Sequence, residues 1–274
     1  MYEGKSTAVV IGHNAGLGDL IVMNGAVRYL ASQYDKTYLV CWNSRLKHVE
    51  FVYRDDDKII PFVKPHPRNT HLAISRHKNA HKILVERNPE VEFAPFRRGL
   101  FNKETEWLQQ AQKYNLPNDI IWPKVFYAIQ GVSYEKRYEN YFLQRDHQRE
   151  DGLFESLNLP EEYVFVVRDT RKYKFSLEPP TSLPVVDPAN YDWSNTLIFD
   201  WMKVIENASE IHVVDTCWLH LIRMMQLNVP KFYWAERDII MTGSGYLNDG
   251  YDSGWERTAS LEPVFTVKPS YHRH

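Results

Sequence analysis

The sequence has little cysteine and no excess of either charge. Of its 274 residues only Cys41 and Cys217 are cysteines, and neither stands in a C-x-x-C or Cys/His pattern of the zinc-binding type. A disulfide-stapled secreted fold is thereby excluded, and a reducing cytoplasm is the expected location. Thirty-three Lys and Arg balance thirty-five Asp and Glu, for a net charge of −2, so no general field attracts nucleic acid. Any phosphate-binding site is expected to be local.

Long apolar runs are also missing. No stretch approaches the roughly 20 apolar residues that cross a bilayer, and the amino terminus has no basic segment followed by an apolar one. We therefore expect a protein without a transmembrane segment, and peripheral attachment to a membrane stays open. With 43% hydrophobic and 14% aromatic residues, the chain still has ample apolar surface for a packed core.

The first half alternates strand and helix patterns. Residues 6–12 predict a buried strand, and from Asp19 onward apolar side chains recur at three- and four-residue spacing, as on one face of a helix. Gly12, Gly16 and Gly18 predict a tight loop between the two. A strand at 38–41, a helix at 43–53 and a strand at 58–63 are expected to follow. This alternation is typical of a parallel α/β sheet.

The pattern restarts after a long charged segment. Residues 134–159 predict a long helix that links two halves, whereas residues 64–100 fit no clear pattern. The second half is expected to hold strands at 163–167, 183–186, 211–214 and 231–234, with helices at 196–208 and 216–227. We therefore predict two Rossmann-like domains, one over residues 1–155 and one over residues 156–274.

The glycine loop lacks the signatures of the common nucleotide sites. A dinucleotide-binding fingerprint needs a third glycine where this chain has Ile21, and an acid at the end of the second strand where it has Cys41-Trp-Asn43. A Walker loop needs Lys and then Ser or Thr after the glycines, and neither follows them here. The strand, glycine loop and helix still expose backbone N–H groups that bind anions or polar ligands.

Asp19 follows the glycines in the first turn of the predicted helix. An acid at this position commonly caps the helix. A carboxylate at the carboxyl edge of a parallel sheet also faces the crevice where such folds bind ligands, so Asp19 is a candidate general base as well. The two roles are compatible, and we expect the helix dipole to keep Asp19 ionised at neutral pH.

Two segments of the chain form a recognisable pair of motifs. The first reads Gly16-Leu-Gly18-Asp19-Leu-Ile followed by Asn24-Gly-Ala-Val-Arg28, and the second runs from Leu197 to Asp215-Thr216-Cys-Trp-Leu-His220. Together they resemble the opening and the donor-side segment of the heptosyltransferase-like glycosyltransferases of family 9. The resemblance implies the GT-B fold, in which two Rossmann-like α/β domains face each other across a cleft. It also implies inverting, metal-independent sugar transfer, with Asp19 as the base, the acceptor on domain 1–155 and the nucleotide sugar on domain 156–274.

The same resemblance points to donor-binding residues in the second half. The basic loop after the strand at 163–167 contains Arg168, Arg171, Lys172 and Lys174. Its cations would stabilise a departing diphosphate when no metal does so, and a solvated turn is the alternative. The donor-side motif contributes Asp215, Thr216 and His220, for which an ordinary helix cap or a packed histidine is the alternative. Cys217 replaces the family's glycine, which leaves the donor open between ADP-, GDP- and UDP-linked sugars.

No metal-binding pattern emerges from the sequence. Asp55 to Asp57 is similar to the D-x-D element of the other large sugar-transferase fold, but it follows a predicted helix instead of a strand, so a solvated turn is the preferred interpretation. The spacings of His66, His71, His77 and His81 do not make a zinc motif.

The sequence therefore predicts a glycosyltransferase that moves a sugar from a nucleotide-sugar co-substrate to a glycan, a lipid-linked or another hydroxyl acceptor, with no separate cofactor. Asp19 would take the acceptor's proton, and Gly16 and Gly18 would shape the loop beside it. A sugar-nucleotide epimerase of the same fold and a non-catalytic nucleotide- or glycan-binding protein stay open. Labelled transfer, isomerisation without an acceptor, and binding without turnover distinguish the three.

Overall fold

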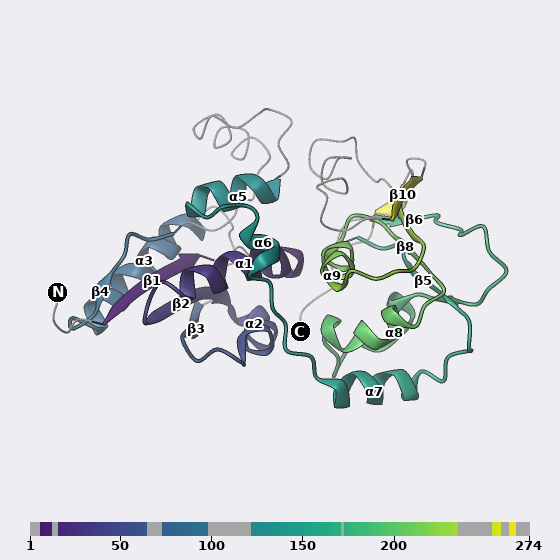
Figure 1. Ribbon diagram of the computed structural model, residues 1–274, viewed down its shortest axis with the longest axis horizontal. Coiled ribbons are helices and arrows are strands. Elements are labelled where there is room, and N and C mark those ends of the chain that lie inside the picture. Colours follow the sequence, from purple (N-terminus) through teal and green to yellow (C-terminus); the bar gives the residue numbers. More distant parts are fainter. Residues whose placement is uncertain are drawn as a thin grey trace. The chain divides into compact units, whose positions relative to one another are not determined.

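The protein consists of two α/β units (Figure 1). The computed structural model describes residues 6–12, 16–64, 73–97, 122–170, 173–234, 254–258 and 263–266. The chain divides into Met1–Gln144 and Arg145–His274, and the described part of each unit is built on its own parallel sheet. The predicted α/β class with parallel sheets is confirmed. Among these residues no helix is both long and apolar enough to cross a bilayer.

The sheet of the first unit has the order β3-β2-β1-β4, and every neighbouring pair is parallel. Its strands are β1 (Thr7–Gly12), β2 (Lys36–Trp42), β3 (Ile59–Lys64) and β4 (Glu92–Phe93). Buried runs of β-branched residues favour strands of this kind. The three longer strands confirm those expected at 6–12, 38–41 and 58–63. The chain proceeds from β1 to β2 on one side and later places β4 on the other, so the strand order reverses at β1.

The described helices of the first unit either connect these strands or, as α5 and α6 do, follow the last of them. They are α1 (Leu17–Ala31), η1 (Asn43–Arg45), α2 (Leu46–Tyr53), α3 (Ala73–Arg87), α5 (Trp122–Gln130) and α6 (Lys136–Glu139). α3 falls in the stretch for which the sequence predicted nothing. Ala80 and Leu84 of this helix pack against Val10 and Tyr38 in the core. The rest of the α3 sequence is largely polar, and so narrow an apolar stripe is a weak helix signal.

Contacts from α5 and α6 anchor α1. The buried Tyr127 hydroxyl donates to the Val22 carbonyl at 2.9 Å and accepts from the Ala26 N–H at 3.1 Å, so it occupies one rung of the α1 hydrogen-bond ladder. A Cβ on Gly25 would lie 2.2 Å from the carbonyl oxygen of Lys136, so only glycine lets α6 approach this closely. These long-range contacts hold in place the helix whose first turn contains Asp19.

The sheet of the second unit has the order β10-β9-β8-β5-β7 and is also parallel throughout. Its strands are β5 (Val164–Val167), β7 (Val185–Val186), β8 (Glu210–Val213), β9 (Lys231–Trp234) and β10 (Trp255–Thr258). A separate antiparallel pair joins β6 (Tyr173–Phe175) to β11 (Pro263–Thr266). The four strands expected in the second half are confirmed as β5, β7, β8 and β9. Here the strand order reverses at β5, which lies between β7 and β8.

The helical segments of the second unit are α7 (His147–Ser156), η3 (Pro188–Asn190), η4 (Ile198–Trp201), α8 (Met202–Glu206) and α9 (Cys217–Met225). The helix expected at 196–208 is the short 3-10 turn η4 continued by α8, and α9 confirms the helix expected at 216–227. Trp201 of η4 and Trp218 of α9 are buried against Phe165 of β5. These aromatic contacts form part of the core of the unit.

The single long helix expected over residues 134–159 is wrong. α6 and α7 form its two ends, and a non-helical segment separates them. In that segment the Phe142 N–H donates to the Asn24 side chain and the Phe142 carbonyl accepts from it, both at 3.0 Å, so neither group is available to a helix. Asp146 then caps α7 by accepting a hydrogen bond from the Arg149 N–H at 3.1 Å.

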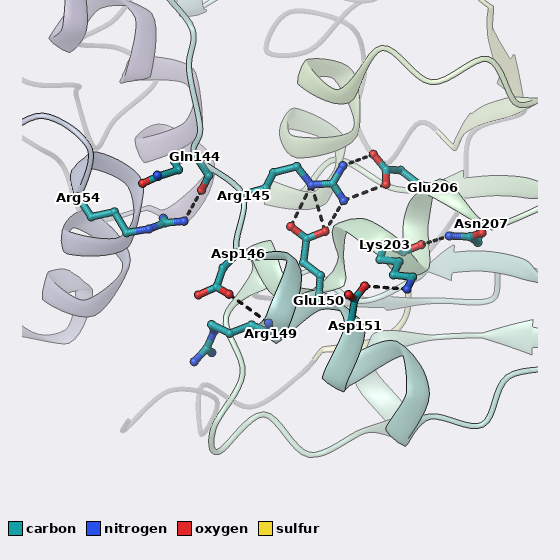
Figure 2. A network of polar contacts seen from close by, with 10 residues as sticks. All are labelled: Arg54, Gln144, Arg145, Asp146, Arg149, Glu150, Asp151, Lys203, Glu206 and Asn207. Atoms are coloured by element: carbon teal, nitrogen blue, oxygen red, sulfur yellow. Dashed lines mark hydrogen bonds and ion pairs between the residues drawn. The ribbon is translucent and has the colours of Figure 1, made fainter.

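The two units divide between Gln144 and Arg145 and not after residue 155, so α7 belongs to the second unit. Figure 2 shows the polar contacts behind this division. The Arg145 guanidinium binds Glu150 of α7 and Glu206 of α8 together, and Lys203 of α8 pairs with Asp151 of α7 at 2.7 Å. These ion pairs hold α7 to α8, whereas the charge pattern of α7 seen alone is compatible with either domain.

Candidate active site

Asp19 lies in the first turn of α1, just beyond the strand at which the order of the first sheet reverses. Its Oδ2 accepts a hydrogen bond from the Gly16 N–H at 3.1 Å, which confirms the expected capping role. A Cβ on Gly16 would lie 2.5 Å from that oxygen, so glycine leaves room for the carboxylate. Ligands of open α/β sheets bind outside the carboxyl ends of the strands at such reversal points. The position of Asp19 therefore suits a catalytic group.

Burial raises the pKa of Asp19 to about 6, and the Gly16 N–H and the charge of Arg45 offset this only in part. The expectation that the helix dipole governs this group needs correction, because the loss of hydration outweighs the stabilising contacts. Most molecules still carry the carboxylate at pH 7, and it binds a proton more tightly than an ordinary aspartate does. Both properties suit a general base.

Two arginines that the sequence analysis did not single out lie at the same edge of the sheet. Arg45 ends η1 directly after β2, and its charge acts on Asp19. Arg97 follows β4 and lies beside the end of β1, since its N–H donates to the Val10 carbonyl and its own carbonyl accepts from the Gly12 N–H, both at 2.9 Å. The position of Arg45, a cation shortly after an expected strand, could have marked it as a candidate site residue in the sequence. Arg97 had no such signal, because its stretch fitted no pattern.

The glycine loop is shorter than expected. Gly16 is the N-cap of α1, with an extended backbone (φ −85°, ψ 144°), and Gly18 already lies inside the helix. The predicted loop therefore ends at Gly16, and residues 13–15 lie outside the described residues. The roles of Gly16 and Gly18 beside an acceptor stay predictions.

In the second unit, Arg168 directly follows β5, the strand at which the order of that sheet reverses. The Val214 N–H donates to the Val167 carbonyl at 3.1 Å, so Arg168 and Asp215 continue two neighbouring strands past the carboxyl edge. The Arg168 Nε lies 3.0 Å from Oδ2 of Asp187, the residue that follows β7. Asp187 was not singled out from the sequence, where it is one acid within an irregular stretch. The reversal point of this sheet thus holds an ion pair whose carboxylate is buried and whose arginine is partly exposed.

The described part of the basic loop is not a solvated turn. Arg168 pairs with Asp187. Lys174 belongs to β6, and its Nζ lies 4.0 Å from Oδ1 of Asp169. Burial raises the pKa of Asp169 and of Asp187, while the charges of Arg168 and Lys174 lower them. Arg171 and Lys172 lie outside the described residues. Donor binding by the loop stays a prediction.

Asp215 and Thr216 lead from β8 into α9. Thr216 is the N-cap residue, but its hydroxyl does not cap the helix and instead lies 3.4 Å from the Val214 carbonyl. An ordinary threonine cap is therefore the wrong interpretation of this residue. His220 lies one turn further on and is buried. The donor-binding roles of Asp215, Thr216 and His220 stay predictions.

The acidic triplet proves to be structural in part. Both Nη atoms of Arg28 donate to the Asp55 carboxylate, at 2.9 and 2.8 Å, so the solvated-turn interpretation is wrong for Asp55. The Lys58 N–H donates to Asp56 at 3.1 Å and shapes the turn before β3. Throughout the described ranges, no group of three or more His, Cys, Asp or Glu could hold a metal ion. His66 and His71 lie outside those ranges.

Neither a family model nor a curated protein matches the sequence. The structure, in contrast, has the fold of family 9 glycosyltransferases. It is similar to a glycosyl transferase of family 9 from Veillonella parvula DSM 2008, with 10% identity over 97% of this chain and 90% of that chain, at a TM-score of 0.55. It is also similar to ADP-heptose LPS heptosyltransferase II of E. coli, with 9% identity over 92% of this chain and 90% of that chain, at a TM-score of 0.53. At such identities the likeness shows the fold, and it agrees with the family that the two motifs resemble.

Proposed function

We propose that the protein is a glycosyltransferase that moves a sugar from an ADP-, GDP- or UDP-linked donor to a hydroxyl group of a glycan or lipid-linked acceptor. The observation that carries the proposal is the Asp19 carboxylate, with a pKa of about 6, at the reversal point of the first sheet. The fold shared with a family 9 glycosyl transferase and with a heptosyltransferase named for ADP-heptose supports it.

In the proposed reaction, the acceptor oxygen attacks the anomeric carbon of the sugar while Asp19 takes the hydroxyl proton. The bond from the anomeric carbon to the diphosphate oxygen breaks, and the nucleoside diphosphate leaves with the electron pair. A single displacement of this kind inverts the anomeric configuration. Arg168 and, by the sequence resemblance, Arg171 and Lys172 stabilise the charge of the departing diphosphate without a metal.

The two units have different roles in this proposal. The first supplies the base and, at the same edge, the cation of Arg45, whose charge acts on Asp19. The second supplies Arg168 and the beginning of α9, which come from neighbouring strand ends. That the two domains face each other across a cleft, as in the GT-B fold, stays a prediction of the sequence resemblance.

A nucleotide screen followed by a transfer assay tests the proposal. Thermal unfolding is measured with ADP, GDP, UDP and their sugars, because a ligand at 100 times its Kd adds about 2.7 kcal/mol of stability. Labelled sugar from the donor that binds should then pass to an acceptor hydroxyl in excess EDTA. Isomerisation of the donor without any acceptor identifies an epimerase instead, and binding with no turnover over a broad acceptor panel identifies a binding protein. Activity that requires Mn²⁺ after EDTA treatment contradicts metal independence.

The value of kcat/KM should rise with pH and level off above about pH 7. Asp19 accepts a proton only when it is ionised, and its pKa is about 6. Below that value the ionised fraction of the free enzyme, and with it kcat/KM, falls about tenfold per pH unit. An aspartate with an ordinary pKa of about 3.9 would place this fall some two units lower. The measurement is kcat/KM, which reports the free enzyme, from about pH 4.5 to about pH 8.5, and a flat profile through pH 6 would rule out a base with this pKa.

A further inference from the structure

Asp187 has both carboxylate oxygens engaged at the end of β7. Oδ1 accepts a hydrogen bond from the Ala189 N–H at 3.0 Å, as the cap of η3, and Oδ2 lies 3.0 Å from the Arg168 Nε. The Trp193 indole N–H donates to the Pro188 carbonyl at 2.8 Å, and this hydrogen bond fixes the η3 helix. The carboxylate therefore has one orientation, set by the backbone that follows it.

Arg168 meets this carboxylate through the inner end of its guanidinium. Its side chain is 20% exposed, whereas that of Asp187 is 4% exposed. The Nε–H does not point straight at Oδ2, so the contact is an ion pair rather than an aligned hydrogen bond. Arg168 Nη1 lies 3.8 Å from Oε1 of Glu178, a side chain that is 80% exposed and too distant for a hydrogen bond. The outer fork of Arg168 is thus available to an anion.

The register of the strands places this fork at the reversal point of the sheet. β5 pairs with β7 on one side and with β8 on the other, so the residues after all three strands reach the same carboxyl edge. Arg168 continues β5, between Asp187 after β7 and Asp215 after β8. The planar guanidinium presents two parallel N–H groups to a phosphate when its plane is held, and loses this geometry when the side chain is free to rotate.

We propose that Asp187 is a positioning residue, which holds the Arg168 guanidinium so that its Nη groups bind the diphosphate of the nucleotide. The inference rests on the proposed function and adds to it a residue that no sequence motif marks. Asp187 does not touch the nucleotide. Its negative charge alone would weaken the binding of an anion, so its contribution through orientation opposes its contribution through charge.

Because the two contributions oppose each other, the direction in which the nucleotide Kd changes distinguishes them. Asp187→Asn keeps the size of the side chain and an oxygen for the Ala189 N–H, but it removes the charge that holds Arg168. If Asp187 positions Arg168, the Kd of the nucleoside diphosphate should rise about tenfold, as for the loss of one charge-assisted contact. If Asp187 only neutralises charge, the same substitution should lower the Kd. Isothermal titration with ADP, GDP and UDP in turn measures the change.

A double-mutant cycle separates positioning from a purely structural role. Arg168→Gln should weaken binding by itself, and Asp187→Asn added to Arg168→Gln should weaken it no further, because Asp187 acts only through Arg168. A structural role would persist in the Arg168→Gln background. The double variant has neither charge, so it leaves no unpaired buried ion. Asp151→Asn, which removes the partner of Lys203 between α7 and α8, is the matched control and should keep the wild-type Kd.

The outcomes distinguish this inference from the proposed function. Wild-type protein that binds none of the three nucleoside diphosphates overturns both. Wild-type protein that binds one of them, together with an Asp187→Asn variant that binds it equally well or more tightly, overturns the positioning role and leaves the glycosyltransferase proposal standing. Additive effects in the double-mutant cycle also overturn the positioning role.

Discussion

Asp19→Asn should lower kcat by about 10²–10⁴-fold and leave the donor affinity unchanged. Asparagine has nearly the same size, and its amide oxygen can still accept the hydrogen bond from the Gly16 N–H, so the start of α1 is kept. It cannot take a proton from the acceptor. Because the second unit binds the donor in the proposed function, the loss should appear in kcat and not in the Kd of the nucleotide. Steady-state kinetics and nucleotide titration measure the two quantities.

The same substitution should make the protein more stable at neutral pH. The folded-state pKa of Asp19 is raised to about 6, so the folded protein binds this proton more tightly than the unfolded chain does. The wild type therefore loses stability as the pH rises from about 4 to about 6, by at most about 3 kcal/mol, and Asp19→Asn does not. The denaturation midpoint of the variant should exceed that of the wild type at pH 7.5 and equal it near pH 4.

The matched control is Asp56→Asn, in the turn before β3, where the amide oxygen can replace the carboxylate as acceptor for the Lys58 N–H. This variant should have wild-type kinetics and stability. If Asp19→Asn is folded and its kcat stays within about threefold of the wild type when chemistry limits the rate, Asp19 is only a helix cap and the catalytic assignment is wrong.

Gly25→Ala should destabilise the first unit by about 2–3 kcal/mol or more, although alanine is the better helix former. The added Cβ would lie 2.2 Å from the Lys136 carbonyl oxygen and 2.8 Å from the Arg137 Cα. Both are backbone atoms, so no side-chain rotation relieves the overlap, and α6 must move away from α1. The displacement also strains the adjacent rung of α1 at Ala26, where the Tyr127 hydroxyl is inserted.

Gly152→Ala is the matched control for this effect. Gly152 also lies within a helix, α7, but its Cβ would meet nothing within 4 Å. Here helix propensity acts alone, and the variant should gain about 0.5–1 kcal/mol. Denaturant unfolding gives the free energies, and hydrogen exchange should show faster opening of α1 and α6 in Gly25→Ala only. Equal stabilisation by the two alanines would contradict the close approach of α6 to α1.

Local patterns were sufficient to predict most of the framework. The buried strand at 6–12, the helix that follows it and the strands of the second half each depend on side chains a few residues apart, and their period already reveals which face is buried. The Gly16–Asp19 hydrogen bond spans three residues, so the capping role of Asp19 was also visible in the sequence. The pKa of Asp19 was harder to predict from the sequence. The pKa of this group depends on how much of the protein covers it, and burial reversed the direction expected from the helix dipole alone.

Long-range contacts decided the rest. The helix expected at 134–159 is interrupted because the Phe142 backbone bonds to Asn24, which lies 118 residues away in the sequence. Asp187 and Arg168 come together because a parallel sheet brings the ends of β7 and β5 to one edge. A chain segment records its own periodicity and its own capping residues, but it does not record which distant backbone group or charge will lie against it. For that reason the strands and the position of Asp19 could be predicted one at a time, and the ion pair between Arg168 and Asp187 could not.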